Sequence, residues 1–367
     1  MLKPTTTPSL LRVFCAIWIS LSSAVHAEPT QPKAGDSPTR HLREAAKFRF
    51  ELDNDIAFGS DNQFSNGWQF RLHSPVYTSW DTISEAPAWV RTVGKRFPGL
   101  SSSGLYRRAG FSVGQIISTP SDVASRERIE NDVPYVGVLA GQISWLAFDD
   151  DDMRAFEITL GTMGRSSLGE QSQNVIHKLT GSEVAEGWDN QVRDEIALNL
   201  NYLRKRKLFH GQNRAGTRAW DGALSGSIAL GNIFTYADIG MEMRYGANMP
   251  RGFAIMPEIV GAIIGYDATL APPRNKSNSL YVSASLSVQN HLHDLLSDGS
   301  VFSERHGEWV DRHPWTAYGS VGLHYETPTR AFHVHGVVST DTLDVEALAD
   351  NEDKRNRFLS ITLEWKR

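Results

Sequence analysis

The chain has 367 residues, a formal net charge of −5 and a single cysteine, Cys15. The negative charge argues against a nucleic-acid partner, and one cysteine supports neither a disulfide framework nor a zinc–thiolate site. The length fits two soluble domains or one large barrel.

The first 27 residues have the pattern of a secretory signal peptide. Two basic residues, Lys3 and Arg12, accompany the apolar stretch Val13–Ala24, and Val25-His26-Ala27 resembles a small-residue cleavage site. A membrane anchor is the competing interpretation, but the apolar stretch is short and interrupted by serines. We expect processing after residue 27, which removes the only cysteine and takes the net charge from −5 to −7. No later stretch approaches the roughly 18 apolar residues of a membrane-spanning helix.

A polar segment (28–47) precedes a region, 48–367, that is dominated by period-two alternation. In Ser279–Asn290, leucine, valine and alanine side chains fall on one face and mainly serines fall on the other. Such segments are typical of half-buried strands. Twelve are predicted: 48–58, 66–74, 109–117, 135–147, 154–164, 196–208, 217–231, 234–246, 279–290, 315–326, 331–340 and 357–365.

A soluble sandwich also alternates, so alternation alone does not decide the fold class. The signal peptide, the mature chain without cysteine, the aromatic strand ends and segments of about ten residues favour an outer-membrane barrel. We therefore predict an all-β protein, a 12-stranded antiparallel transmembrane β-barrel. Its apolar strand faces would meet lipid and its polar faces would line the interior.

With both chain termini in the periplasm, segments 59–65, 118–134, 165–195, 291–314 and 341–356 become outer loops. The periplasmic connection 75–108 includes a possible amphipathic helix at Trp89–Val93. In the connection 247–278, the apolar stretch Pro257–Tyr266 could instead form a thirteenth strand. We expect the basic run Arg204–Lys207 to be a solvated strand end rather than a phosphate clamp.

One outer loop carries the densest group of potential acid–base residues. Gln173 and His177 are four apart, so a short helix would place them on one face, and Glu183 and Asp189 follow closely. A histidine on a short helix is more often structural than catalytic. At the barrel rim, however, His177 could accept a proton from water, with one of the two carboxylates orienting its ring.

A second group lies at the same rim, at the outer end of the first strand. Asn54 occupies the apolar, lipid-facing register, where a polar group is costly unless it is satisfied. Either the strand bulges at Asn54-Asp55, or a helix from the 165–195 loop covers it. Asp55 among oxygen donors suits a hard cation such as Ca²⁺, which could polarise an ester carbonyl. The alternative is a solvated acidic rim that binds divalent ions near lipopolysaccharide phosphates.

These residues resemble motifs of the outer-membrane lipid A 3-O-deacylase family. The matching elements are Asn54-Asp55, Phe64-Ser65-Asn66-Gly67, Val133-Pro134-Tyr135-Val136-Gly137, Gln173 with His177 and Glu183, and Trp188-Asp189-Asn190-Gln191. Phe64, Ser65 and Val133 depart from the family's tyrosine, threonine and arginine. The chain also ends on Trp365-Lys366-Arg367 instead of the aromatic residue usual in barrels.

The resemblance implies a Ca²⁺-dependent hydrolase in the bacterial outer membrane that removes the 3'-linked acyloxyacyl group of lipid A. His177 would be the base, supported by Gln173 and Glu183. Ser65, Asn54 and Asp55 would surround the metal and the oxyanion. The implied partners are lipopolysaccharide as substrate and membrane lipid, and no protein partner is predicted.

Two other functions fit some of the same features. A non-enzymatic barrel of the same fold, porin-like or adhesive, would also have charged interior faces and long outer loops. An outer-membrane phospholipase would need a nucleophilic serine beside its histidine, and the sequence offers no evident pairing of that kind.

Overall fold

The structure is a computed structural model that describes residues 46–55, 63–181, 184–257, 266–273, 277–303, 309–343 and 355–366. All of them belong to one compact unit, His41–Arg367. The predicted signal peptide and Glu183 lie outside the described residues. No helix in the described ranges is long and apolar enough to cross a membrane.

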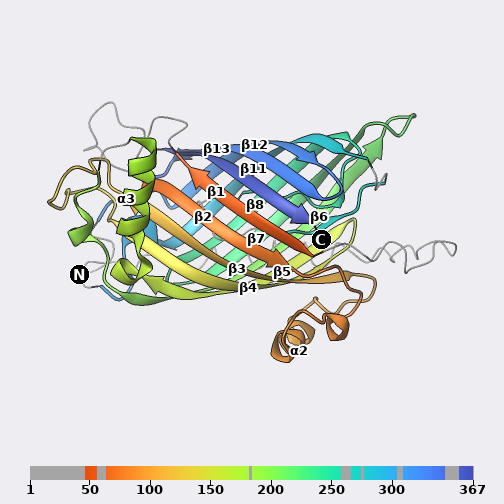
Figure 1. Cartoon of the computed structure of the whole chain (residues 1–367), viewed down its shortest axis with the longest axis horizontal. Helices are drawn as coiled ribbons and strands as arrows, with labels where there is room; N and C mark the ends of the chain where they lie inside the picture. Colours follow the sequence, from red (N-terminus) through yellow and green to blue (C-terminus); the bar gives the residue numbers. More distant parts are fainter. Residues whose placement is uncertain are drawn as a thin grey trace, which may run out of the picture. The chain divides into compact units, whose positions relative to one another are not determined.

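Twelve antiparallel strands close into a barrel in which each strand pairs with its neighbour in the chain and the first pairs with the last (Figure 1). They are β1 (Lys47–Asn54), β2 (Gln63–His73), β3 (Tyr106–Thr119), β4 (Val136–Phe148), β5 (Asp152–Met163), β6 (Glu195–Gln212), β7 (Ala219–Gly231), β8 (Phe234–Ala247), β11 (Ser279–Asp294), β12 (Trp315–Glu326), β13 (Arg330–Asp341) and β14 (Arg355–Lys366). Each predicted segment overlaps one of these strands, which confirms the predicted fold. Strand β1 ends at Asn54 and Asp55 forms a bend, while residues 56–58 of the first predicted segment lie outside the described residues.

The wall is polar inside and apolar outside. Along β1, Arg49 and Glu51 are buried in the lumen, whereas Phe48 on the other face is 37% exposed. Residues directly opposite each other on paired strands share a face. The strand register therefore shows whether each residue faces the lumen or the outside. Exposed aromatic side chains also gather near the end that holds the short turns: Trp220, Tyr245, Tyr325 and Trp365. An apolar outer band with aromatic residues at its edge is the surface of a lipid-embedded barrel.

The lumen is filled rather than open at its middle. Arg71 donates to Glu157 at 3.1 Å, and Gln69 donates through Nε2 to Gln142 Oε1 at 2.9 Å. All four side chains are buried. These contacts pair the charge of Arg71 with that of Glu157 and join strands that are far apart in the sequence.

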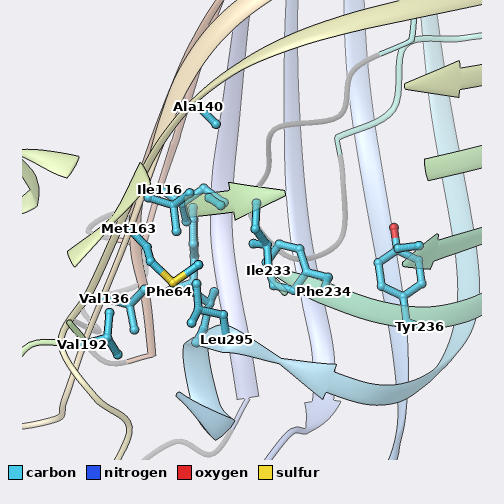
Figure 2. Close-up of a cluster of buried hydrophobic side chains, with 14 of the residues drawn as sticks. Phe64, Ile116, Val136, Ala140, Met163, Val192, Ile233, Phe234, Tyr236 and Leu295 are labelled. Atoms are coloured by element: carbon cyan, nitrogen blue, oxygen red, sulfur yellow. The ribbon is translucent and has the colours of Figure 1, made fainter. Parts of the chain in front are cut away.

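An apolar cluster fills the lumen near the end where β1 finishes (Figure 2). The ring of Phe64 on β2 lies 5.1 Å from that of Phe358 on β14, measured between centroids. The short helix α4 (Leu295–Asp298) turns inward from β11, and buried Leu295 joins the cluster.

At the opposite end, the connection between β8 and β11 folds back into the lumen. Its strands β9 (Arg251–Gly252) and β10 (Thr269–Leu270) pair as a small hairpin, which we call the plug together with Asp267. Asp267 Oδ2 lies 2.9 Å from Lys47 Nζ and 2.8 Å from Arg108 Nη1. Burial alone would raise the pKa of Asp267, but Lys47, Arg108 and Arg49 hold it well below its ordinary value. Residues 258–265, the core of the suggested thirteenth strand, lie outside the described ranges, and the barrel closes with twelve strands.

Two helices lie on the outer wall at opposite ends of the barrel (Figure 1). Helix α2 (Ala88–Arg96) contains the predicted amphipathic segment and covers Trp145 of β4, whose Nε1 donates to Val90 O at 2.8 Å. Helix α3 (Gly169–Thr180) contacts β3 and β4 near the other end. It is the helix predicted in the outer loop 165–195.

The basic run in β6 is not a solvated strand end, so that prediction is wrong. Lys205 and Lys207 turn inward, where they pair with Glu242 and Asp221. Arg204 turns outward and lies 3.0 Å from Asp152. The strand continues to Gln212, so period-two alternation divides the run between two faces.

Candidate functional site

Helix α3 approaches the barrel wall closely because two glycines face each other. Gly137 on β4 pairs with outward-facing Ile117 of β3. A Cβ on Gly137 would lie 2.1 Å from Ser167 Oγ and 3.2 Å from Gly169 Cα. A Cβ on Gly169 would lie 2.7 Å from the ring of Trp188. Side chains at these positions would push the start of α3 off the wall.

One face of α3 is buried and carries the predicted site residues. Gly169, Gln173 and His177 recur every four residues and are all buried, with His177 only 4% exposed. Val175 on the other face is 58% exposed. The helical spacing therefore does place Gln173 and His177 on one face, and it is the protected face of a helix that packs on β3 and β4.

Trp188 holds the Gln173 side chain. Its indole Nε1 donates to Gln173 Oε1 at 2.7 Å, and both side chains are 2% exposed. Trp188 belongs to a 3-10 helix (Trp188–Asn190), and its rings lie 5.1 Å from the ring of Tyr135. Asp189 is exposed and pairs with Arg165 at 2.8 Å, so it is a surface carboxylate. The other candidate carboxylate, Glu183, lies outside the described residues.

The second half of the site is formed where β1 ends and β2 begins. Asn54 Nδ2 donates to the main-chain oxygen of Ser65 at 3.0 Å. The Ser65 and Thr119 hydroxyls are hydrogen-bonded at 2.6 Å. Pairing between β2 and β3 shifts register between Phe64 and Asn66, which makes Ser65 the extra residue of a bulge. The irregularity thus lies at Ser65, whereas Asn54 pairs regularly with Asn66.

The wall beside α3 carries further polar residues that the sequence analysis missed. Gln115 of β3 lies in the outward register between Val113 and Ile117, yet it is 2% exposed. Its Oε1 accepts from Trp68 Nε1 at 3.0 Å, and its Nε2 donates to Ser167 O at 2.6 Å. Polar residues in the lipid-facing register were the signal that singled out Asn54. The same signal identifies Gln115 and Thr119.

The side chains near the end of β1 offer oxygen ligands, the type that a hard cation prefers. Asp55 is buried, 1% exposed, directly after Asn54, and the Asn54 side chain carries an amide oxygen, Oδ1, besides the Nδ2 that donates to Ser65. In the described ranges, no three His, Cys, Asp or Glu side chains converge as a metal site. A Ca²⁺ ion here would therefore combine one carboxylate with amide, hydroxyl or main-chain oxygens, all of which are normal calcium ligands.

Comparison with known proteins places this barrel in a family. The family model of outer membrane protein LpxR matches residues 13–367. The chain belongs to that family. Among solved structures it is similar to LpxR from Salmonella typhimurium, with a TM-score of 0.64 and 12% identity, covering 88% of this chain and 100% of that one. That match shows the shared barrel fold. The β domain of the Bordetella autotransporter BrkA covers as much of the chain at 8% identity, but its TM-score is 0.35. No curated protein matches the sequence.

Membership of the LpxR family makes the chain a bacterial outer-membrane protein. Two of the residues that depart from the family motifs lie in apolar surroundings. Phe64, in place of tyrosine, lies in the apolar lumen cluster, and Val133, in place of arginine, packs with Val310 and Leu343. Ser65, in place of threonine, keeps the hydroxyl that bonds to Thr119. The departures therefore leave the polar contacts between β1, β2 and β3 in place.

Proposed function

We propose that this protein is a lipid A deacylase that hydrolyses the 3'-linked acyloxyacyl ester in the outer leaflet, using Ca²⁺ and water activated by His177. The observation that carries the proposal is a set of buried or half-buried polar side chains on the lipid side of a barrel wall. His177 and Gln173 lie on the protected face of α3, and Asn54 and Ser65 lie at the same end of the barrel. Membership of the LpxR family, an outer-membrane lipid A deacylase family, supports this assignment.

The location suits a substrate that remains in the membrane. Apolar side chains on the outer wall of the following strands, such as Leu160 on β5 and Ile196 on β6, are more than half exposed. Acyl chains can lie against such residues while the ester reaches the polar side chains beside the helix. A soluble substrate would not need a site on the lipid-facing wall.

In the proposed reaction, His177 takes a proton from a water molecule as the water oxygen attacks the ester carbonyl. The carbonyl π electrons move to its oxygen, and the carbon–oxygen bond to the sugar then breaks. The imidazolium returns the proton to the departing alkoxide. Bound Ca²⁺ would add positive charge near the carbonyl oxygen, and Asp55 and Asn54 are the residues that would hold it. Glu183 would orient His177, as the family resemblance implies.

The test is lipid A mass spectrometry in a bacterium with known lipid A. Expression of the wild-type chain should reduce the lipid mass by one 3'-acyloxyacyl group, whereas His177→Ala should leave the mass unchanged. His210→Ala is a matched control, since that histidine is exposed and lies at the opposite end of the barrel. An unchanged mass with correctly inserted wild-type protein and Ca²⁺ present would refute the proposed function.

A further inference from the structure

The hydrogen bond between Trp188 and Gln173 fixes which way the buried amide points. An indole nitrogen can only donate, so the amide atom 2.7 Å from Trp188 Nε1 must be the oxygen Oε1. The usual ambiguity between the two ends of a glutamine amide is therefore removed. Nε2 must point away from Trp188.

That second end is a buried donor without an acceptor among the described residues. Gln173 Nε2 has essentially no exposed surface and makes no hydrogen bond there. Buried polar groups are normally paired. A donor held in this state, on the same helical face as His177, is ready for an acceptor that arrives with the substrate.

A second indole–amide pair in the same part of the wall provides a comparison. Trp68 donates to Gln115 Oε1 at 3.0 Å, but there Gln115 Nε2 donates to Ser167 O at 2.6 Å. Both ends of that amide are satisfied within the protein, so the Gln115 pair is a structural link between the wall and the loop. Within the described residues, the Gln173 pair lacks the second bond.

We propose that Gln173 Nε2 donates a hydrogen bond to the ester carbonyl oxygen as negative charge develops on that oxygen; this inference rests on the proposed function. Trp188 is the positioning residue that prevents the amide of Gln173 from flipping. No proton leaves Gln173. The negative oxygen that forms when water adds to the carbonyl accepts from Nε2, and it releases its electron pair when the ester bond breaks. Preorganised donors of this kind stabilise the transition state more than the bound substrate.

The surroundings of Trp188 explain how it can act as a rigid support. Its ring fills the space above Gly169, where a Cβ would lie 2.7 Å away, and it packs beside Tyr135. Gln191 Nε2 donates to the main-chain oxygen of Trp188 at 2.8 Å. The indole is therefore held on several sides before substrate binds.

The experiment measures steady-state deacylation of lipid A in mixed micelles with Ca²⁺. Gln173→Met keeps the side-chain volume but removes the donor, and kcat should fall about 100-fold with KM within about threefold. Trp188→Phe should lower kcat about tenfold, because the amide can then turn. In the Gln173→Met background, Trp188→Phe should cause no further loss, since a double-mutant cycle detects a residue that acts through another.

Trp68→Phe is the matched control, because it breaks the other indole–amide bond. It should lower thermal stability and leave kcat per folded protein within about twofold. If Gln173→Met does not fold, Gln173→Glu replaces it: it retains an acceptor for Trp188 and puts an anionic oxygen where Nε2 lies, so kcat should also fall at least 100-fold.

A kcat equal to that of the wild type in Gln173→Met or Gln173→Glu would overturn the inference while leaving the proposed function intact. Additive losses in the double variant would show that Trp188 does not act through Gln173. Wild-type protein that does not deacylate lipid A would overturn the proposed function and this inference together.

Discussion

Asn54 points to the outside of the barrel, in the same register as Phe50 and Leu52, but it is hydrogen-bonded to Ser65. Gln115 repeats this arrangement on β3, with both ends of its amide satisfied. An unsatisfied polar group facing hydrocarbon costs several kcal/mol, so such residues occur where another part of the chain provides partners. A single polar residue that breaks the apolar face of a strand is therefore informative about a site on a barrel wall.

Replacement of Asp55 tests the proposed metal role. Because Asp55→Asn removes the carboxylate from a site that is otherwise made of neutral oxygens, half-maximal deacylation should require at least about tenfold more Ca²⁺. Activity measured against free Ca²⁺, buffered with a chelator, gives this value. Asp189→Asn, an exposed carboxylate at the same end of the barrel, should not change it. An identical Ca²⁺ dependence in Asp55→Asn would contradict the assignment.

Helix α3 depends on the wall beneath it rather than on its own length. Its N-cap residue Leu168 makes no side-chain capping bond, and a helix of this size is marginal in isolation. What holds it is close packing of Gly137 on the wall against Gly169 at the start of the helix. The buried face of the helix, with Gln173 and His177, is thus positioned by contacts that any added atom would disturb.

Two glycines of β4 allow a paired test of this packing. Gly137→Ala should reduce deacylation at least about tenfold, because its Cβ would collide with Ser167 and Gly169. Gly141→Ala should leave activity unchanged, since its Cβ meets only ordinary contacts beginning at 3.7 Å. Both variants should still migrate differently with and without heating in electrophoresis, which shows that the barrel is folded. Equal activity in the two would show that the close approach of α3 is not required.

Across the whole barrel, the lumen is occupied at both ends and in the middle. The apolar cluster with α4, the Arg71–Glu157 pair and the plug block it in turn. This arrangement disfavours the porin alternative, because an open channel needs a lumen free of side chains. A lumen filled by side chains is instead typical of small barrels.

Planar-bilayer recording tests the filled lumen. The wild-type protein should show no steady single-channel conductance of the size that an open porin gives, and His177→Ala should behave identically. A large, stable conductance in both would instead favour the non-enzymatic, porin-like alternative.

The plug should also make stability depend on pH through Asp267. Its folded-state pKa lies below the unfolded value, so its stabilisation is full above about pH 4 and is lost as the pH falls toward the folded-state pKa. Asp267→Asn should lower the free energy of unfolding at pH 7 by about 3 kcal/mol, because Lys47 and Arg108 stay buried without this partner.

Guanidinium unfolding in micelles at several pH values measures this effect. The difference between wild type and Asp267→Asn should shrink as the pH drops below about 4. Asp150→Asn, which breaks the more exposed pair with Arg251, should cost at most about 1 kcal/mol. A pH-independent difference would show that the carboxylate charge is not what stabilises the plug.

The twelve strands, their polar and apolar faces and the shared face of Gln173 and His177 were predictable from the sequence. These features repeat every two or four residues, so each stretch of chain carries its own signal. The basic run of β6 was misinterpreted, because the environment of a charged residue depends on the face on which alternation places it.

Other features arise only when distant parts of the chain meet. Lys47 and Thr269 are 222 positions apart and bond in the plug, and Trp188 reaches Gln173 across 15 positions and a turn. The bulge at Ser65 depends on how β2 pairs with β3. Hydrogen bonds and ion pairs across such separations produce no periodic pattern in the sequence, because the partners meet only when the barrel closes. The alternation therefore determines the wall, whereas tertiary packing decides what fills the lumen and how the amide beside His177 is turned.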